Sequence, residues 1–146
     1  AVDTSGFAPE SVFRQVAGNS DMLLFDLKHA DNETHLKQTG VSNTQIINNL
    51  KLMSLNGKPY WIRIPVIPGF NSSNDDMLAI RDLITSLPGR GAEKICLLPY
   101  HKTGFHKNKM LGSITNDSFF EVPEKQRLNE IKEIFSETGI HVKIGG

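Results

Sequence analysis

Three short apolar runs constrain the fold of this chain more than any other feature of its sequence. They are Met22–Leu27, Tyr60–Ile67 and Ile95–Leu98, and turn-forming residues bound each of them. Nearly continuous hydrophobicity over so short a length is typical of parallel β-strands that are covered on both faces. The runs recur at intervals of roughly 35 residues, the length that one strand, one crossover helix and two loops need. The sequence therefore predicts consecutive βαβ units.

Segments of helical periodicity lie between and around these runs. Their apolar residues recur three and four positions apart, as on the buried face of an amphipathic helix. The expected helices are Pro9–Ala17, Asn43–Asn56, Asn74–Leu87 and a last one that begins near Pro123 and ends at Gly139. A short strand is expected at Ile140–Ile144, and Val2–Thr4 resembles the end of a first strand, so we expect further residues upstream. Strands and helices alternate throughout, which predicts an α/β fold with parallel strands.

The composition fits one globular domain and argues against several classes of partner. With 146 residues, 38% of them hydrophobic, the chain can bury a core of its own. Its 16 basic and 16 acidic residues cancel, so we expect neither nucleic acid nor a membrane surface as a partner. No apolar stretch approaches the roughly 20 residues of a membrane span, and we expect a cytoplasmic protein. The single cysteine, Cys96, fits a buried core position and excludes a three-cysteine cluster site within these residues.

Polar residues at the ends of the predicted strands are the strongest indication of a functional site. Along the chain they are Asp3 and Thr4, Asp26 and Lys28, Arg63, and His101. In an α/β barrel the carboxyl ends of the strands meet at one rim, and active sites are built there from several strands. We therefore expect Asp3, Asp26, Lys28, Arg63 and His101 to lie close together at a common rim.

Side-chain alternation places Asp26 and Lys28 on the same inward face as Leu24, while the apolar residues between them face the helices. An inward carboxylate or ammonium is costly unless it is paired, hydrogen-bonded or in contact with a ligand. The simpler alternatives are an ion pair between Asp26 and Lys28, an Arg63 that bridges a neighbouring carboxylate, and a His101 that caps or packs. The remaining histidines show no ligand spacing, so we expect no transition-metal site.

A basic segment follows the fourth strand. It runs from His101 to Lys109, includes Lys102 and Lys107, and surrounds Phe105. A solvated loop is the simpler interpretation, and a docking site for an acidic or peptide partner is the alternative.

Five motifs match, in order and in spacing, the activating enzymes of glycyl radical enzymes. They are Asp3-Thr4-Ser5-Gly6, Phe25-Asp26-Leu27-Lys28-His29, Thr39-Gly40-Val41, Arg63-Ile64-Pro65-Val66-Ile67-Pro68-Gly69 and Leu97-Leu98-Pro99-Tyr100-His101. The series continues through Gly104, Lys107, Leu111 and Gly112 into the last helix and strand. The chain thus resembles the C-terminal part of an enzyme of the pyruvate formate-lyase activating type, in the radical S-adenosylmethionine superfamily.

The resemblance implies an incomplete (β/α) TIM-like barrel, with parallel strands, outer helices and the N-terminal strands missing. Residues 1–146 would form the C-terminal portion of this partial barrel domain. In the family, a reduced 4Fe–4S cluster cleaves S-adenosylmethionine, and the resulting 5′-deoxyadenosyl radical abstracts hydrogen from a backbone glycine of a partner enzyme. The implied partners are the glycine loop of a pyruvate formate-lyase-like enzyme and an electron donor such as flavodoxin or ferredoxin.

The resemblance also implies roles for the residues of the rim. By position, Asp26, Lys28, Arg63 and His101 resemble the family's contacts to S-adenosylmethionine. Asp3, Thr4, Asp26 and the backbone of Leu24 resemble its monovalent-cation site. Carboxylate, hydroxyl and carbonyl oxygens are hard ligands that suit such a cation.

The chain departs from the family pattern in one respect. The Cys-x3-Cys-x2-Cys cluster loop and the Gly-Gly-Glu segment are expected before Asp3, and neither is present. Cluster iron needs thiolates, so we expect this polypeptide alone to hold no cluster and to perform no turnover. Four or five strands also cannot close a barrel. We therefore expect self-association, or disorder near Ala1–Gly6, which a monodisperse monomer with an ordered first strand would contradict.

Two other functions remain compatible with the residues alone. One is a Schiff-base, aldolase-like barrel enzyme in which Lys28 attacks a carbonyl with help from Asp26, a reaction that borohydride trapping would reveal. The other is a non-catalytic interaction module that docks a partner through the basic segment.

Overall fold

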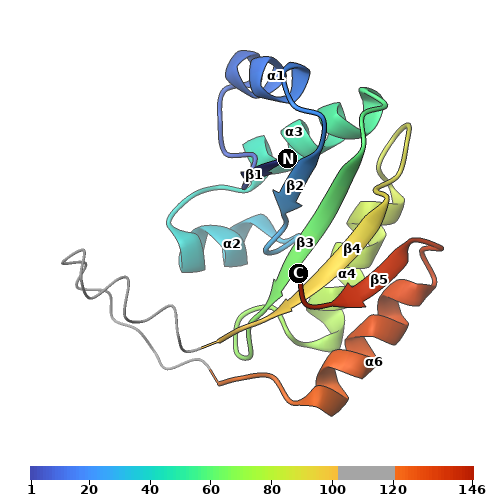
Figure 1. Ribbon diagram of the computed structural model, residues 1–146. Helices are drawn as coiled ribbons and strands as arrows, with labels where there is room; N and C mark the ends of the chain where they lie inside the picture. Colours follow the sequence, from blue (N-terminus) through green and yellow to red (C-terminus); the bar gives the residue numbers. More distant parts are fainter. Residues whose placement is uncertain (102–120) are drawn as a thin grey trace.

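Five parallel strands form one sheet in chain order, with helices between them (Figure 1). The computed structural model describes residues 1–101 and 121–146. The strands are β1 (Val2–Thr4), β2 (Leu23–Asp26), β3 (Tyr60–Val66), β4 (Lys94–Pro99) and β5 (His141–Ile144). The helices are α1 (Glu10–Gly18), α2 (Asn32–Thr39), α3 (Thr44–Leu55), α4 (Asn74–Thr85) and α6 (Lys125–Ser136). The predicted α/β class with parallel strands is confirmed.

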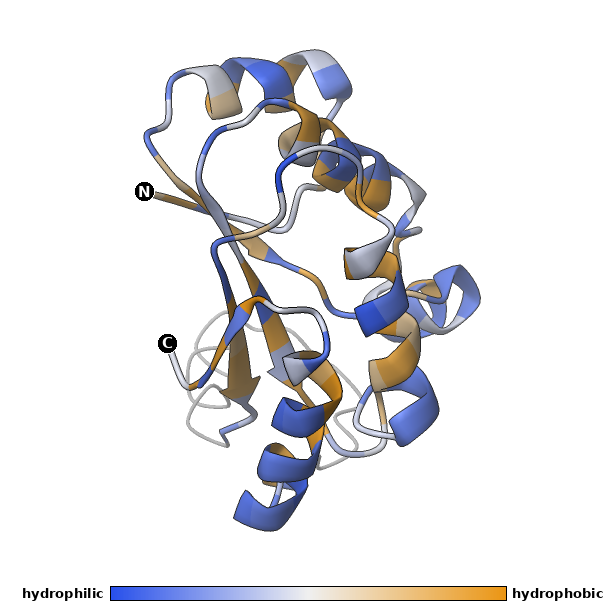
Figure 2. Cartoon of the chain, turned by 90° about the vertical axis from the view of Figure 1, so that its right-hand side faces the viewer, coloured by the Kyte–Doolittle hydropathy of each residue, from blue (hydrophilic) through white to orange (hydrophobic). Residues whose placement is uncertain are grey.

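The two faces of the sheet differ in burial. Along β3 every second residue is buried, starting at Tyr60, and the residues between them are half-exposed. The buried face packs under the helices, and within the described ranges no helix covers the opposite face (Figure 2). The core therefore lies between the sheet and its helices, and includes Phe25, Ile62, Ile64, Ile95 and Leu97. The opposite face, which includes Leu24, Trp61 and Arg63, is the inner face of an open barrel.

One helix was absent from the sequence prediction. Helix α2 is almost entirely polar, and its apolar residue Leu36 is 47% exposed, so no apolar stripe marks it. Helix α2 is instead defined by capping interactions at both of its ends. The Asp31 side chain accepts a hydrogen bond from the Thr34 N–H at 2.8 Å, and Gly40 closes the helix with a φ of 78°. The other predicted helices and strands are present, with ends shifted by a few residues.

The first strand is ordered. Val2, Asp3 and Thr4 pair in parallel register with Leu23, Leu24 and Phe25. The expectation of disorder near Ala1–Gly6 does not hold for these paired residues, and self-association of the open sheet stays a prediction. Within the ranges described, no helix is long and apolar enough to span a bilayer.

Tyr60, at the start of β3, contributes a pH-sensitive part of the stability. Its side chain is fully buried, and its hydroxyl donates to the Arg90 carbonyl at 3.1 Å. Burial raises the pKa of Tyr60 to about 12, because the phenolate would lose its hydration. The folded state therefore holds this proton more tightly than the unfolded state, whose pKa is near 10.0. The contribution of Tyr60 to the free energy of unfolding is fully present below pH 10.0 and is lost as the pH rises from there through the folded-state pKa.

We predict that Tyr60→Phe lowers the free energy of unfolding by about 1 kcal/mol at pH 7, because the Arg90 carbonyl loses its donor. The difference in unfolding free energy between wild type and variant should shrink as the pH rises above about 10. Only the wild type has a phenol that ionises more readily in the unfolded state, so only the wild type loses stability there. Urea unfolding at pH 7 and pH 11 measures both effects. A difference that stays constant with pH would show that Tyr60 does not titrate as its burial requires.

Candidate functional site

Asp3, Asp26 and Arg63 form an ion-pair cluster across three adjacent strands. Asp26 ends β2, whereas Asp3 is the middle residue of β1 and Arg63 the middle residue of β3, so the cluster lies deeper along the sheet than the expected strand ends. Asp26 and Arg63 are register partners on β2 and β3. Asp3 is in register with Leu24, which precedes Asp26 by two residues on the same face of β2. The Arg63 Nε donates to Asp26 Oδ1 at 2.7 Å, and its Nη1 donates to Asp3 Oδ2 at 3.0 Å. One guanidinium therefore links β1, β2 and β3. This is the convergence that the sequence predicts for these three residues.

The Arg63 guanidinium is the least exposed charge of the cluster. Its side chain is 19% exposed, against 26% for Asp26 and 62% for Asp3. Partial burial lowers the pKa of Arg63, but the hydrogen bonds and charges of Asp26 and Asp3 outweigh it and raise the pKa above its usual value. Arg63 thus stays charged at every physiological pH. Arg63 bridges two neighbouring carboxylates, and Asp26 forms its ion pair with Arg63 and not with Lys28.

The cluster keeps unused hydrogen-bonding capacity. A guanidinium has five N–H donors, and the two carboxylates use two of those on Arg63. Within the described residues, the second oxygen of Asp3 and of Asp26 has no hydrogen-bond partner. Two carboxylates and one guanidinium leave a net charge of about −1 at the rim. The arrangement can therefore accept a ligand with acceptor groups, a cation, or both.

Three further predicted residues lie nearby but outside this ion-pair cluster. Leu24 is half-buried on the inner face, in register with Asp3. Thr4 is in register with Phe25, and its hydroxyl accepts the Gly6 N–H at 2.9 Å. Lys28 lies two residues beyond Asp26, and within the described residues its ammonium has no ion-pair or hydrogen-bond partner.

His101 is exposed and follows β4 by two residues. No hydrogen bond or ion pair joins it to the cluster within the described residues. The rest of the basic segment, with Lys102, Lys107 and Lys109, lies outside those residues. So do the Gly104, Leu111 and Gly112 positions of the family resemblance.

Buried asparagines fix the loops that surround the rim, and sequence reasoning missed them. Asn49 donates to the carbonyls of Gly6 and Ala8 at 2.7 and 2.8 Å, which holds the loop after β1. Asn43 donates to the carbonyls of His29 and Ala30, both at 3.0 Å, which holds the loop after β2.

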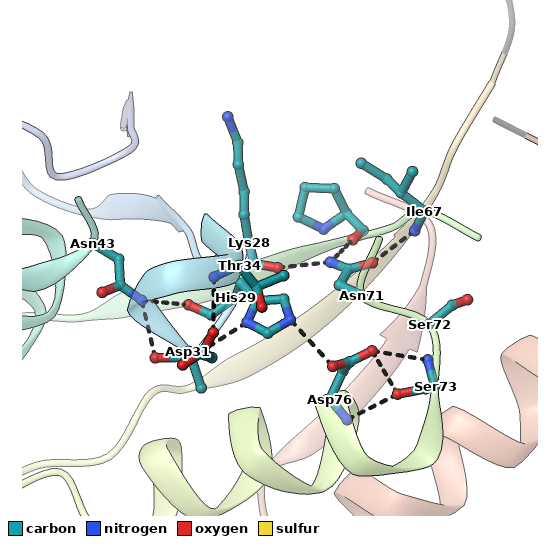
Figure 3. Close-up of polar contacts among 12 residues, drawn as sticks. Lys28, His29, Asp31, Thr34, Asn43, Ile67, Asn71, Ser72, Ser73 and Asp76 are labelled. Carbon is teal, nitrogen blue, oxygen red and sulfur yellow. Dashed lines mark hydrogen bonds and ion pairs between the residues drawn. The ribbon is translucent and has the colours of Figure 1, made fainter. Parts of the chain in front are cut away.

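Asn71 joins the ends of β2 and β3. Its amide donates to the carbonyls of Lys28 and Pro65, both at 2.7 Å, and its oxygen accepts the Ile67 N–H at 2.9 Å (Figure 3). Asn43, Asn49 and Asn71 are all at most 1% exposed. Buried amides are almost always hydrogen-bonded. Of the three, only Asn49 lies within a helix, three residues after the buried Ile46 and four before the buried Met53, and this spacing places it on the apolar face without naming its partners.

No three or more His, Cys, Asp and Glu side chains in the described ranges group as a metal site. Cys96 is buried in β4, in register with Arg63. The residues present therefore do not fit an iron–sulfur cluster, which needs several thiolates. They do fit a hard monovalent cation in the kind of ligand they offer, namely carboxylate and carbonyl oxygens.

The chain resembles known activating enzymes over its whole length. It is 36% identical over 146 residues to the trans-4-hydroxy-L-proline dehydratase activating enzyme of Clostridioides difficile, covering 100% of this chain and 48% of that protein. It is 36% identical over 126 residues to the pyruvate formate-lyase-activating enzyme of Staphylococcus aureus, covering 86% of this chain and 49% of that protein. The chain thus spans about half the length of these relatives. No family profile matches it.

Solved structures give the same result. A crystallised domain of the pyruvate formate-lyase-activating enzyme of Bacteroides vulgatus superposes with a TM-score of 0.81 at 30% identity, covering 99% of this chain and 80% of that domain. A radical SAM methyltransferase of Sphaerobacter thermophilus shares the fold, with a TM-score of 0.67 at 16% identity, covering 98% of this chain and 39% of that protein. The fold is thus the incomplete (β/α) barrel that the sequence predicts.

The chain belongs to the family of the pyruvate formate-lyase-activating enzymes and corresponds to their C-terminal part. The resemblance that the sequence motifs indicate is confirmed.

We predict that Arg63→Met lowers the free energy of unfolding by about 1 kcal/mol, because it leaves the half-buried Asp26 without its cation. Arg63→Lys should recover only part of this, since one ammonium cannot reach both carboxylates as a guanidinium does. Arg81→Met is the matched control, because Arg81 also bridges two carboxylates, Asp82 and Glu137, but both are well exposed. Urea unfolding at pH 7 measures all three variants. Equal losses for Arg63→Met and Arg81→Met would contradict the prediction.

Proposed function

We propose that this chain is the C-terminal half of an activase that generates a glycyl radical on a partner enzyme of the pyruvate formate-lyase type. The observation that most supports this is the Arg63 bridge between Asp3 and Asp26, at the rim of a parallel sheet that the family shares. Reductive cleavage of S-adenosylmethionine at a 4Fe–4S cluster would supply the radical chemistry. The partners would be the glycine loop of that enzyme and an electron donor such as flavodoxin or ferredoxin.

In this proposal Asp26, Lys28, Arg63 and His101 bind S-adenosylmethionine. Arg63 keeps unused N–H donors, and Lys28 has an ammonium without a partner in the described residues. Both groups suit the carboxylate and hydroxyl acceptors of such a ligand. Asp26 is held in place by Arg63, and its second oxygen has two lone pairs, one for a ligand hydroxyl or ammonium and one for a cation. The chain's own residues thus orient the ligand and compensate its charges.

Asp3, Asp26, Thr4 and the backbone of Leu24 would hold a monovalent cation. Each of the two carboxylates uses one oxygen on Arg63, which leaves the other for a metal ion. The three charges of Asp3, Asp26 and Arg63 sum to about −1, which attracts a cation to the two carboxylates. The Thr4 hydroxyl accepts from Gly6 and still has a second lone pair.

The thiolates of the cluster would come from residues outside this sequence, because Cys96 is the only cysteine within it. This chain alone is therefore expected to be inactive. The Schiff-base and interaction-module alternatives gain no specific support, since the relatives at 36% identity are activating enzymes. Self-association through the open sheet remains compatible with the two edge strands, β1 and β5.

The proposal is tested by ligand binding to the full-length protein with its cluster reconstituted. Arg63→Met, Lys28→Met and Asp26→Asn should each weaken S-adenosylmethionine binding by about tenfold or more, since each removes a charge-assisted contact. Calorimetric titration measures the affinity, and iron content verifies that the cluster is intact. Arg81→Met should bind like wild type. Unchanged affinity in all three rim variants would refute the assignment.

The cation site makes a separate prediction. S-adenosylmethionine affinity of the same protein should rise with potassium or sodium concentration at constant ionic strength, with choline as the replacement ion. Asp3→Asn should shift the half-saturating cation concentration upward by about tenfold, because it removes one ligand charge. An affinity that is the same in choline and in potassium would show that no monovalent cation binds at this rim.

A further inference from the structure

Two buried side chains from different parts of the chain hold the three residues that follow Leu27, through three hydrogen bonds. The Lys28 carbonyl accepts from Asn71, which follows β3, and the carbonyls of His29 and Ala30 accept from Asn43, which precedes α3. These contacts lie outside the regular ladder of β2. The segment Lys28–Ala30 is therefore fixed although it is not part of a strand (Figure 3).

His29 adds a fourth attachment and lies on the opposite side of the backbone from the Lys28 side chain. Its side chain is 3% exposed and packs against Phe70, with ring centroids 5.5 Å apart and ring planes tilted by 32°. Its Nδ1 accepts the Asp31 N–H at 2.9 Å. The proton of the neutral ring must therefore be on Nε2, which donates to Asp76 Oδ1 at 3.2 Å.

Asp76 is itself rigidly held, so the contact ties the end of β2 to helix α4. The second carboxylate oxygen of Asp76 accepts the Ser73 hydroxyl at 2.5 Å and the Ser73 N–H at 3.3 Å, in a capping box. Such a box satisfies the N-terminal N–H groups of the helix and fixes its first turn. His29 thus connects the rim to a rigid element of the outer layer.

Lys28 combines a fixed backbone with a side chain that the neighbouring contacts leave available. Its backbone is fixed at the carbonyl, and its side chain extends away from the His29 and Asn71 contacts (Figure 3). A long lysine side chain loses rotamer freedom when it binds, and a mobile backbone would add to that cost. Because the Lys28 backbone is already fixed in the free protein, ligand binding does not have to pay the entropy of ordering it.

We propose that His29 is a positioning residue: through its hydrogen bond to Asp76 it holds Lys28 at the rim and thereby strengthens the contact between Lys28 and S-adenosylmethionine. The inference rests on the proposed function, in which Lys28 binds that ligand. His29 itself touches no ligand, since it is buried on the helix side of the sheet. Neither the sequence motifs nor the comparisons assign it a role.

The test is a double-mutant cycle in the full-length protein with its cluster reconstituted, with S-adenosylmethionine affinity as the readout. His29→Asn cuts the contact selectively: its amide oxygen can still accept the Asp31 N–H, but the shorter side chain cannot reach Asp76. His29→Gln is the matched control, because its longer amide can donate to Asp76. Asp76→Ser removes the same contact from the α4 side, while the N-cap hydroxyl of Ser73 remains to accept the N–H of residue 76.

We expect His29→Asn and Asp76→Ser each to weaken binding by about threefold to tenfold, and His29→Gln to restore most of the affinity. In a Lys28→Met background, His29→Asn should cause no further loss, because it acts through Lys28. The same fold loss in both backgrounds, or no loss from either single variant, would overturn the inference while leaving the proposed function in place. Unchanged affinity in Lys28→Met alone would instead show that the proposed role of Lys28 is wrong, and the inference with it.

Discussion

The site depends on the register between β2 and β3, which places Asp26 opposite Arg63. This register is set by burial and not by the charges. Phe25 on β2 and Ile62 and Ile64 on β3 are fully buried against the helices. A slip of one residue would turn every side chain of a strand to the other face. It would place Arg63 in the core and expose its apolar neighbours, at a cost well above the roughly 1 kcal/mol that an ion pair contributes.

The same burial pattern explains why the rim is polar and accessible. The helices cover one face of the sheet, so the alternate residues face an open interior that no described helix fills (Figure 2). A largely buried guanidinium can be tolerated there because two carboxylates compensate its charge. The structure thus separates a face that stabilises the fold from a face that can meet ligands.

Two kinds of polar residue surround the rim, and they have different tasks. Asn43, Asn49 and Asn71 are buried, and each ties together backbone carbonyls of two residues. They hold the loops, because a loop without ladder bonds needs other partners for its polar groups. Asp26 and Arg63 are only partly satisfied by each other and keep donors and acceptors for a ligand. Rigid loops and incompletely satisfied charges together are what a preorganised binding site requires.

The sequence predicts the charged residues of the rim but not the asparagines that hold its loops. Asp26 and Arg63 stand out because a charge at the end of an apolar run, as at Asp26, or within one, as at Arg63, has few structural explanations. An asparagine within a helix is common on a solvated face, and only the fold shows that Asn49 is turned toward the loop after β1. Helix α2 was missed for a related reason, since caps and not an apolar stripe define it. Periodicity reports what a segment buries, and it is silent on contacts between loops that are distant in sequence.

The charges at the rim also couple the two proposed ligands. Asp3, Asp26 and Arg63 sum to about −1, and Lys28 returns the total to about zero. A monovalent cation bound between the carboxylates would then leave a local excess of about +1, which attracts the carboxylate of a ligand. By linkage, the cation must strengthen binding of the ligand by the same factor by which the ligand strengthens binding of the cation. The exposed position of Asp3 keeps this coupling modest and dependent on salt, because exposed charges are screened over about 8 Å at physiological ionic strength.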